Sequence, residues 1–196
     1  MRRDLVSSLL AIVVITVLFG LGYPLAVTGI SQVAFHGRAN GSLIERDGKL
    51  VGSRLLAQDF RGIPRYFQPR PSTATSYEPA ATAFTNLGPN SRAARRTFAA
   101  SLRGYLRREK RYDPGLRVAQ VPVDAVTSSG SGVDPQISPA NAAIQAHRVA
   151  AVRHLPLQRV TQLIAADTDG RSLGVLGEPG VNVLELNLAI DHLASR

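Results

Sequence analysis

A serine- and glycine-rich run, Ser128-Ser129-Gly130-Ser131-Gly132, carries the residue types of a nucleophile or a phosphate-binding loop. Neither pattern is complete. A nucleophile elbow needs G-x-S-x-G, and a Walker loop needs Gly-Lys followed by Ser or Thr, whereas Val133-Asp134-Pro135 follows the glycines here. The run is therefore predicted to be a tight loop that places Asp134 and Ser138 ahead of a helix.

Two further patterns could hold a metal ion. The stretch Asp167-Thr168-Asp169-Gly170 resembles half of a calcium loop, but its first and last ligand positions would be Ala165 and Leu176, which offer no side-chain oxygen. The closest pair of histidines, His147 and His154, is two helical turns apart, about 10 Å, which is too far for one ion. We expect a turn at 167–170, no metal site and no cofactor of the chain's own.

The second half of the chain is predicted to be mainly helical with little strand, and Leu157, Val160, Leu163 and Ile164 continue the helical pattern beyond Pro156. Asn90 is expected to cap a helix through Arg111, Ser138 and Pro139 to begin one through Leu155, and Asn182 opposite Glu185 to cap the last. Val175 and Leu176 are a short strand candidate. The predicted class of residues 31–196 is one mixed α+β domain.

The predicted helix that begins at Asn90 is strongly basic. Its charge is typical of a solvated face, with a specific anion site as the alternative. Its arginines are Arg92, Arg95, Arg96, Arg103, Arg107 and Arg108.

Residues 40–90 predict a hairpin followed by a loop. Asp47-Gly48 lies between two apolar pairs, which is a hairpin signal. Residues 61–90 hold five prolines, so we expect a loop without regular structure. Because large aromatic rings are rarely left in water, this loop is expected to lie on its own domain or on a partner. The rings are Tyr66, Phe67, Tyr77 and Phe84.

The N-terminal segment predicts a membrane anchor. From Leu5 to Val27 no residue is charged, and a helix of about 23 residues rises about 34 Å, more than the roughly 30 Å of a bilayer's hydrocarbon core. We expect residues 1–30 to be a cytoplasmic N-terminus and transmembrane anchor. The alternatives are a cleaved signal peptide, whose apolar region is ordinarily about 7–15 residues, and a buried helix.

The charges that flank the anchor predict its orientation, and its small residues predict where it packs. Arg2 and Arg3 precede it and no Lys or Arg follows until Arg38, so the N-terminus is expected in the cytoplasm and residues 31–196 outside the inner membrane. Gly22 and Pro24 near its outer end favour packing against helices of membrane partners.

The composition limits the classes of partner that the chain is expected to bind. The formal net charge is +9, which suits membrane lipid or an acidic protein surface. No basic stripe interleaved with aromatic residues is present, so nucleic acid is not expected. Cysteine is absent, which excludes thiolate nucleophiles and disulfides.

Several stretches together resemble the C subunit of the bacterial Kdp-type potassium-transporting ATPase. Gln136, Gly180 and the order Asn90-Ser91 depart from the family's usual pattern. The stretches that carry the resemblance are Gly22-Tyr23-Pro24-Leu25, Phe67-Gln68-Pro69-Arg70-Pro71-Ser72, Asn86-Leu87-Gly88-Pro89, Pro122-Val123-Asp124-Ala125-Val126-Thr127, Ser129-Gly130-Ser131-Gly132-Val133-Asp134-Pro135, Ile137-Ser138-Pro139, Arg148-Val149-Ala150 and Val181-Asn182-Val183-Leu184.

The resemblance implies an accessory subunit of an ATP-driven, high-affinity potassium uptake complex. Its implied partners are a channel-like potassium-binding subunit and a P-type subunit that hydrolyses ATP. The chain lacks the Asp-Lys-Thr-Gly-Thr motif that forms an aspartyl phosphate, so it is not expected to be the catalytic subunit.

Two mechanisms are open under the resemblance. In one, the subunit is a catalytic chaperone that raises the ATP affinity of the pump subunit in a transient ternary complex, with the nucleotide contact at Gln145. In the other, the outer domain caps the potassium entrance and stabilises the assembly. The predicted topology favours the second, because Gln145 would lie outside the cytoplasm.

Functions unrelated to transport remain as alternatives. A membrane-tethered enzyme would need clustered titratable residues, and the only carboxylates in suggestive loops are Asp124, Asp134, Asp167 and Asp169. An envelope- or lipid-binding module would use the basic helix.

Overall fold

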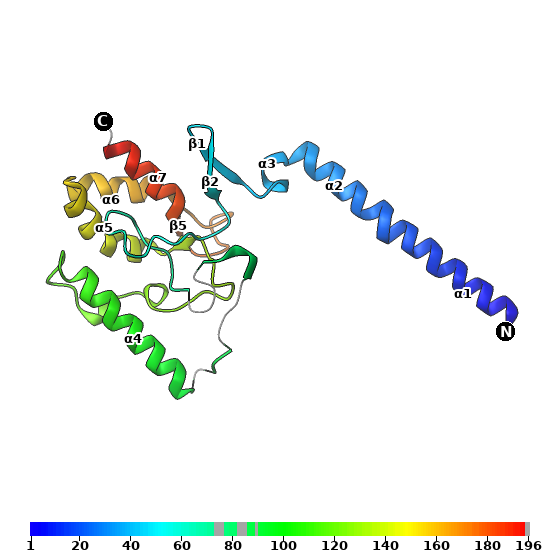
Figure 1. The fold of residues 1–196 in the computed structure, drawn as a ribbon, viewed down its shortest axis with the longest axis horizontal. Helices are drawn as coiled ribbons and strands as arrows, with labels where there is room; N and C mark the ends of the chain where they lie inside the picture. The colour runs from blue at the N-terminus through cyan, green and yellow to red at the C-terminus, as the bar shows by residue number, and fades with distance from the viewer. Residues whose placement is uncertain (73–76, 82–85, 89, 195–196) are drawn as a thin grey trace. The chain divides into compact units, whose positions relative to one another are not determined.

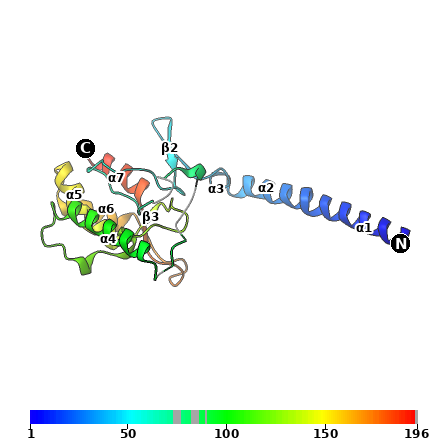
Figure 2. The ribbon, with the colours of Figure 1, turned by 60° about the horizontal axis from the view of Figure 1, so that its bottom comes forward.

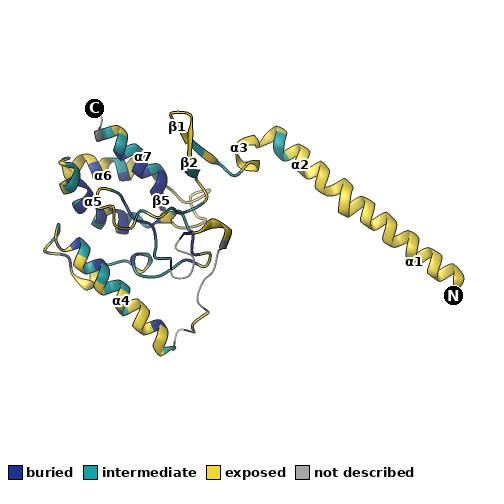
Figure 3. Cartoon of the chain, in the orientation of Figure 1, coloured by how far each residue is buried: buried dark blue, intermediate teal, exposed yellow. Residues whose placement is uncertain are grey.

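The computed structural model describes residues 1–72, 77–81, 86–88 and 90–194. By internal contacts the chain forms two units, Met1–Val51 and Gly52–Arg196. The first contains one continuous helix, Arg2–Ala34, whose mean hydropathy reaches 2.6 and whose apolar window has no buried residue. Figure 3 shows this exposure along the helix. By length and composition the helix can cross a membrane, as predicted for the N-terminal segment.

A π-helical stretch interrupts this helix. The continuous helix comprises α1 (Arg2–Ile15), η1 (Thr16–Gly22) and α2 (Tyr23–Ala34). Tyr23 N–H donates to the carbonyl of Leu18, five residues back. Pro24 follows at the start of α2; a proline in a helix has no N–H to donate and its ring crowds the carbonyl four residues earlier. The wider π turn upstream relieves that crowding.

The predicted hairpin forms after the helix. A short α3 (His36–Ala39) leads to β1 (Leu43–Arg46), which pairs with β2 (Lys49–Ser53). At the turn Asp47 has φ 52° and Gly48 has φ 72°. Positive φ at both central residues is the geometry that an Asp-Gly turn favours, so this prediction is confirmed.

Among its described residues, the second unit contains four α-helices and a small sheet (Figure 1). In this unit the longer helix α4 packs against α5 (Figure 2). The elements of this unit, after β2, are η2 (Pro79–Ala81), α4 (Arg92–Glu109), η3 (Val118–Gln120), η4 (Val123–Ala125), β3 (Gln136–Ile137), α5 (Pro139–Arg153), α6 (Leu157–Ala166), β4 (Thr168–Asp169), β5 (Gly180–Asn182) and α7 (Val183–Ala194).

The sheet of the second unit has the order β3-β5-β4, with both pairs antiparallel. Val181 in the central strand faces Ile137 on one side and Thr168 on the other. The unit is therefore α+β, as predicted for this part of the chain.

Two predictions about strands were wrong. Residues 167–170, predicted as a turn, include strand β4, and Val175–Leu176, predicted as a strand, lie at a turn where only a single bridge joins Ser172 to Leu176. Apolar residue type alone suggested the strand. Pairing with β5, which is distant in sequence, decides the outcome, and Val175 remains 75% exposed.

Two apolar clusters form the core. The larger is built from α5, α6, α7, β5 and Phe67, which is fully buried. The smaller contains Tyr105 of α4 together with Leu116 and Ala125, and Ile144 of α5 packs against it. Helix α5 therefore contributes to both clusters.

The helix caps follow the sequence with one correction. Ser138 accepts a hydrogen bond from Asn141 N–H and is followed by Pro139, as predicted for α5. Asn182 accepts from the backbone N–H groups of Leu184 and Glu185, which confirms it as the cap of α7. The prediction that Asn90 caps α4 was wrong by one residue.

Ser91, and not Asn90, caps α4. Its side chain accepts a hydrogen bond from Ala94 N–H, and the helix spans Arg92–Glu109 rather than reaching Arg111. Both residue types can cap a helix, so the choice between neighbours depends on which one adopts the extended backbone that precedes the first turn.

The proline-rich segment 61–90 contributes to the core. Phe67 and Tyr77 are buried and Tyr66 is half-buried, so these rings lie on the chain's own domain. Phe84 and Pro89 lie outside the described residues. Within the described part of this segment the only regular element is η2.

Candidate functional site

The Gly-Ser loop, residues 129–134, is held by its own serine side chains. Ser129 Oγ accepts from Gly132 N–H at 2.9 Å, and Ser131 Oγ accepts from Val133 N–H at 3.2 Å. Gly132 has φ 75°, a conformation that favours glycine. Gly130 lies at the surface, where an added side-chain carbon would meet no atom within 4 Å. The predicted tight loop is present.

Asp134 at the end of this loop joins it to the proline-rich segment. Its carboxylate accepts from the guanidinium of Arg70 at 3.1 Å and from Gln136 N–H at 3.0 Å. Arg70 also donates to the carbonyl of Ser128 at 3.0 Å. Asp134 therefore serves as an anchor point for two loops.

Ser138, the cap of α5, binds a second carboxylate. Asp124 accepts from Ser138 N–H at 2.9 Å, from Ser138 Oγ at 2.8 Å and from Asn141 Nδ2 at 3.0 Å. A carboxylate next to a helix N-terminus is stabilised by the macrodipole. These bonds attach η4 to the start of α5.

Asn182, which pairs with Gln136 in the sheet, performs a similar joining role. Besides capping α7, its Nδ2 donates to the carbonyl of Arg54 at 2.8 Å. Glu185, predicted to complete the capping box, instead pairs with Arg54 Nε at 3.0 Å. Gly22 and Pro24, the predicted packing positions of the anchor, belong to the N-terminal unit.

Gln145, the residue that the resemblance connects with nucleotide, has its amide fully engaged inside the domain. It is 1% exposed. Its Oε1 accepts from Gln68 N–H at 2.8 Å, and its Nε2 donates to the carbonyl of Gln68 and to Asn141 Oδ1, both at 3.0 Å. The side chain thus pairs with the backbone of Gln68 as a neighbouring strand would.

One turn further along α5, Arg148 forms a buried ion pair. Its Nε donates to Glu109 of α4 at 3.1 Å, and neither side chain is exposed. The same carboxylate accepts from Arg108 Nε at 2.6 Å. Arg148 also donates to Gln145 Oε1 at 2.8 Å and to the carbonyl of Tyr66 at 2.8 Å.

We call these residues the polar clamp: Tyr105, Glu109, Asn141, Gln145 and Arg148. Tyr105 completes it by donating its hydroxyl to Asn141 Oδ1 at 2.8 Å. Burial, followed by the charge of Glu109, raises the pKa of the Tyr105 hydroxyl, so the phenol stays protonated. Burial lowers the pKa of the Arg148 guanidinium, and the Glu109 carboxylate opposes that shift.

The clamp holds a stretch of chain that has no helix or strand of its own. Residues 64–68 run from the surface at Pro64 and Arg65 to the buried Phe67 and Gln68, where unpaired backbone groups are costly. Arg148 binds the carbonyls of Pro64 and Tyr66. Gln145 binds both polar groups of Gln68, and Asn187 of α7 does the same for Phe67, at 2.8 and 2.9 Å.

Sequence reasoning missed most of the clamp, although a signal was present. Asn141, Gln145 and Arg148 recur at i, i+4 and i+7, which places three polar residues on one face of a helix that is otherwise rich in alanine and valine. Glu109 is the only acidic residue within α4. Both features indicate buried pairing rather than solvation.

The hydrogen bonds and the ion pair of the clamp support the fold of the domain. Each clamp side chain is paired inside the domain. Among the residues that the structure describes, no group of three or more His, Asp or Glu lies close enough to hold a metal ion.

Comparison with known proteins assigns the family. Residues 5–192 match the family model described as "K+-transporting ATPase, c chain". The chain belongs to this family. It is 46% identical to the potassium-transporting ATPase KdpC subunit of Methylobacterium nodulans, over 100% of both chains. It is 47% identical to that of Mycobacterium tuberculosis, over 98% and 100% of the two chains, and 48% identical to that of Methylococcus capsulatus, over 95% and 96%.

Membership of this potassium-transporting ATPase family confirms the resemblance seen in the sequence. It makes the chain an accessory subunit of potassium uptake and favours this over the tethered enzyme and the lipid-binding module. The family match, residues 5–192, covers both the N-terminal helix and the α+β unit.

We expect Arg148→Met to lower the free energy of unfolding by about 3–5 kcal/mol, because it leaves Glu109 buried with a poorer set of partners. The double variant Arg148→Met/Glu109→Met should recover part of that loss, since it also removes the buried carboxylate, whose remaining charged partner in the single variant is Arg108. Chemical denaturation of the full chain in detergent, followed by circular dichroism, measures both. A double variant no more stable than the single one would contradict the buried-charge explanation.

Proposed function

We propose that the chain is a non-catalytic subunit that assembles and stabilises an ATP-driven, high-affinity potassium uptake complex. Its partners are a channel-like potassium-binding subunit and a P-type subunit that hydrolyses ATP. The observation that carries the proposal is the exposed apolar helix Arg2–Ala34 joined to a domain whose buried polar side chains serve its own fold. This combination fits a subunit that acts through its contacts with other subunits.

The proposed setting is the inner membrane of a bacterial cell. The helix spans it once, with Arg2 and Arg3 in the cytoplasm and the α+β domain outside. Support comes from the bias of basic residues: two precede the apolar segment and the next is Arg38. Membrane lipid surrounds whatever part of the helix the partner subunits leave uncovered.

The geometry of Gln145 favours assembly over a nucleotide contact. In the chaperone mechanism, ATP would reach Gln145 in a transient ternary complex with the pump subunit. The Gln145 amide already has partners for its oxygen and nitrogen, and freeing it would leave Gln68 N–H and its carbonyl unpaired in the interior. Stranding buried polar groups costs about 1–3 kcal/mol each, which a nucleotide would have to offset.

Gln145→Met separates the two mechanisms, because methionine has a similar shape without hydrogen-bonding groups. We expect the domain to lose stability by about 1–3 kcal/mol per stranded group, while the KM for ATP of the folded complex stays unchanged. Denaturation of the chain and ATP hydrolysis by the purified complex are the two measurements. A complex of normal stability with a raised KM for ATP would instead favour the chaperone.

Replacement of Gly22 tests the assembly role in the membrane. A side-chain carbon added at Gly22 would lie 3.5 Å from the carbonyl of Val17, an ordinary contact, so the helix itself tolerates it. If Gly22 packs against partner helices, Gly22→Leu should reduce co-purification with the other subunits by about tenfold, equivalent to about 1.4 kcal/mol. Gly29→Leu on the same helix is the matched control, and Pro24→Leu should behave like Gly22→Leu. Undiminished co-purification would rule out packing through this site.

A single cysteine reports the topology, because the chain has none of its own. Gln145 is too buried to label, so Ala119, which is exposed in η3, is the better position. We expect Ala119→Cys to react with a membrane-impermeant maleimide in cells with a permeabilised outer membrane. Asp4→Cys, on the predicted cytoplasmic side, should react only after the inner membrane is broken. The reverse pattern would place the domain in the cytoplasm.

A further inference from the structure

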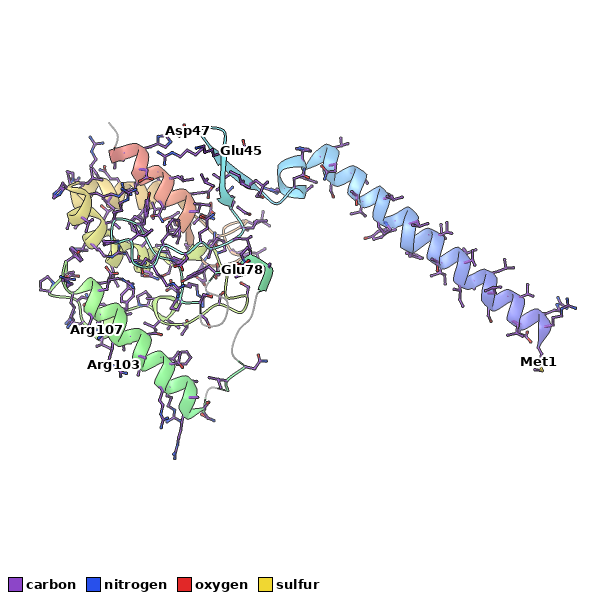
Figure 4. The ribbon with its side chains drawn as sticks, viewed as in Figure 1. Met1, Glu45, Asp47, Glu78, Arg103 and Arg107 are labelled. Carbon is purple, nitrogen blue, oxygen red and sulfur yellow. The ribbon has the colours of Figure 1, made fainter. Side chains whose placement is uncertain are left out.

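A pocket of about 350 Å³ on the α+β unit is lined by four arginines. Arg107 and Arg108 come from the last turn of α4, Arg111 from just beyond it, and Arg148 from α5. Arg107 is labelled on α4 in Figure 4. No Asp or Glu is among the described residues that line this pocket. We call it the arginine pocket.

The positive charge of the arginine pocket is only partly offset. Arg108 and Arg148 share the single carboxylate of Glu109, at 2.6 and 3.1 Å. That carboxylate can neutralise one of the two guanidinium groups. The charges of Arg107 and Arg111 come in addition, and both residues are exposed.

The helix macrodipole is a general reason for basic residues at this end of α4, with no ligand involved. A helix C-terminus carries roughly half a negative charge, which one basic residue satisfies. Here Arg107, Arg108, Lys110 and Arg111 all lie within five residues. With Arg148, these residues bring five positive charges to this end of α4. The macrodipole and Glu109 together offset fewer than two of the five, so a positive excess remains.

The geometry leaves room for a small ligand. Arg107 and Arg111 are four residues apart in sequence, and Gly104 lines the same pocket one turn before Arg107. A side-chain carbon built on Gly104 meets no atom within 4 Å, so the glycine leaves that part of the pocket open. Tyr112 also lines the pocket and brings a phenol, a group that can donate a hydrogen bond.

We propose that the arginine pocket binds a phosphate group. A phosphate presents several oxygens and up to two charges to guanidinium forks, and it can accept from Arg107 and Arg111 together. Arg108 and Arg148, held by Glu109, contribute positive potential from behind. The group can come from free phosphate or from the headgroup of an anionic lipid. The proposal does not rest on the assembly role, and it assigns no ligand contact to Gln145, to which Arg148 donates a hydrogen bond.

The test uses the full chain in a nonionic detergent and isothermal titration calorimetry at constant ionic strength. One arm adds inorganic phosphate, and the other adds mixed micelles of phosphatidic acid and phosphatidylcholine, with phosphatidylcholine alone as the blank. Arg107→Gln/Arg111→Gln removes two pocket charges. Arg92→Gln/Arg96→Gln removes two exposed charges at the other end of α4 and is the matched control.

We expect the pocket double variant to raise the dissociation constant at least about tenfold, with little change in the control. Gly104→Leu, which fills the pocket without changing charge, should weaken binding as well. Binding of inorganic phosphate would identify free phosphate as a source, and binding of phosphatidic acid micelles alone would identify the lipid headgroup. Circular dichroism verifies that each variant is folded.

Three results would overturn the proposal. The first is the absence of binding in both arms. The second is an equal loss in the two double variants, which would mean that only net charge matters. The third is unchanged affinity in folded Gly104→Leu, which would place the anion elsewhere.

Discussion

The α+β unit depends on how the backbone of residues 64–68 is satisfied. This stretch has no helix or strand of its own and becomes buried at Phe67 and Gln68, where N–H and carbonyl groups must find partners. Arg148, Gln145 and Asn187 supply them from α5 and α7. Because Phe67 is fully buried within the same stretch, the hydrogen bonds and the apolar core require each other. Loss of either would release a loop that the core needs.

The buried charge of Arg148 follows from that requirement. A guanidinium can donate to several carbonyls at once, which an apolar side chain or an amide cannot do. Its burial then needs a counter-charge, and Glu109 on α4 provides one. The ion pair thereby connects α4 to α5, between the two apolar clusters. Because Arg108 and Arg148 both pair with the Glu109 carboxylate, the last turn of α4 keeps an excess of positive charge.

The N-terminal helix follows a simpler rule. Its residues are apolar on every side, so its environment must be apolar on every side, and both lipid and partner helices satisfy that condition. Within it, the combination of two glycines, a proline and a π-helical turn gives an irregular surface near Gly22. The family match extends over both this helix and the folded domain.

Much of this protein was determined by sequence alone, because the signals are local. The apolar helix, the Asp47-Gly48 turn and the caps Ser138 and Asn182 depend on neighbouring residues, and each was predicted. The strands β4 and β5, the burial of Gln145 and the pair between Arg148 and Glu109 depend on residues that are distant along the chain. Only the fold brings these partners within hydrogen-bonding distance, so neighbouring residues in the sequence could not indicate which of them would pair.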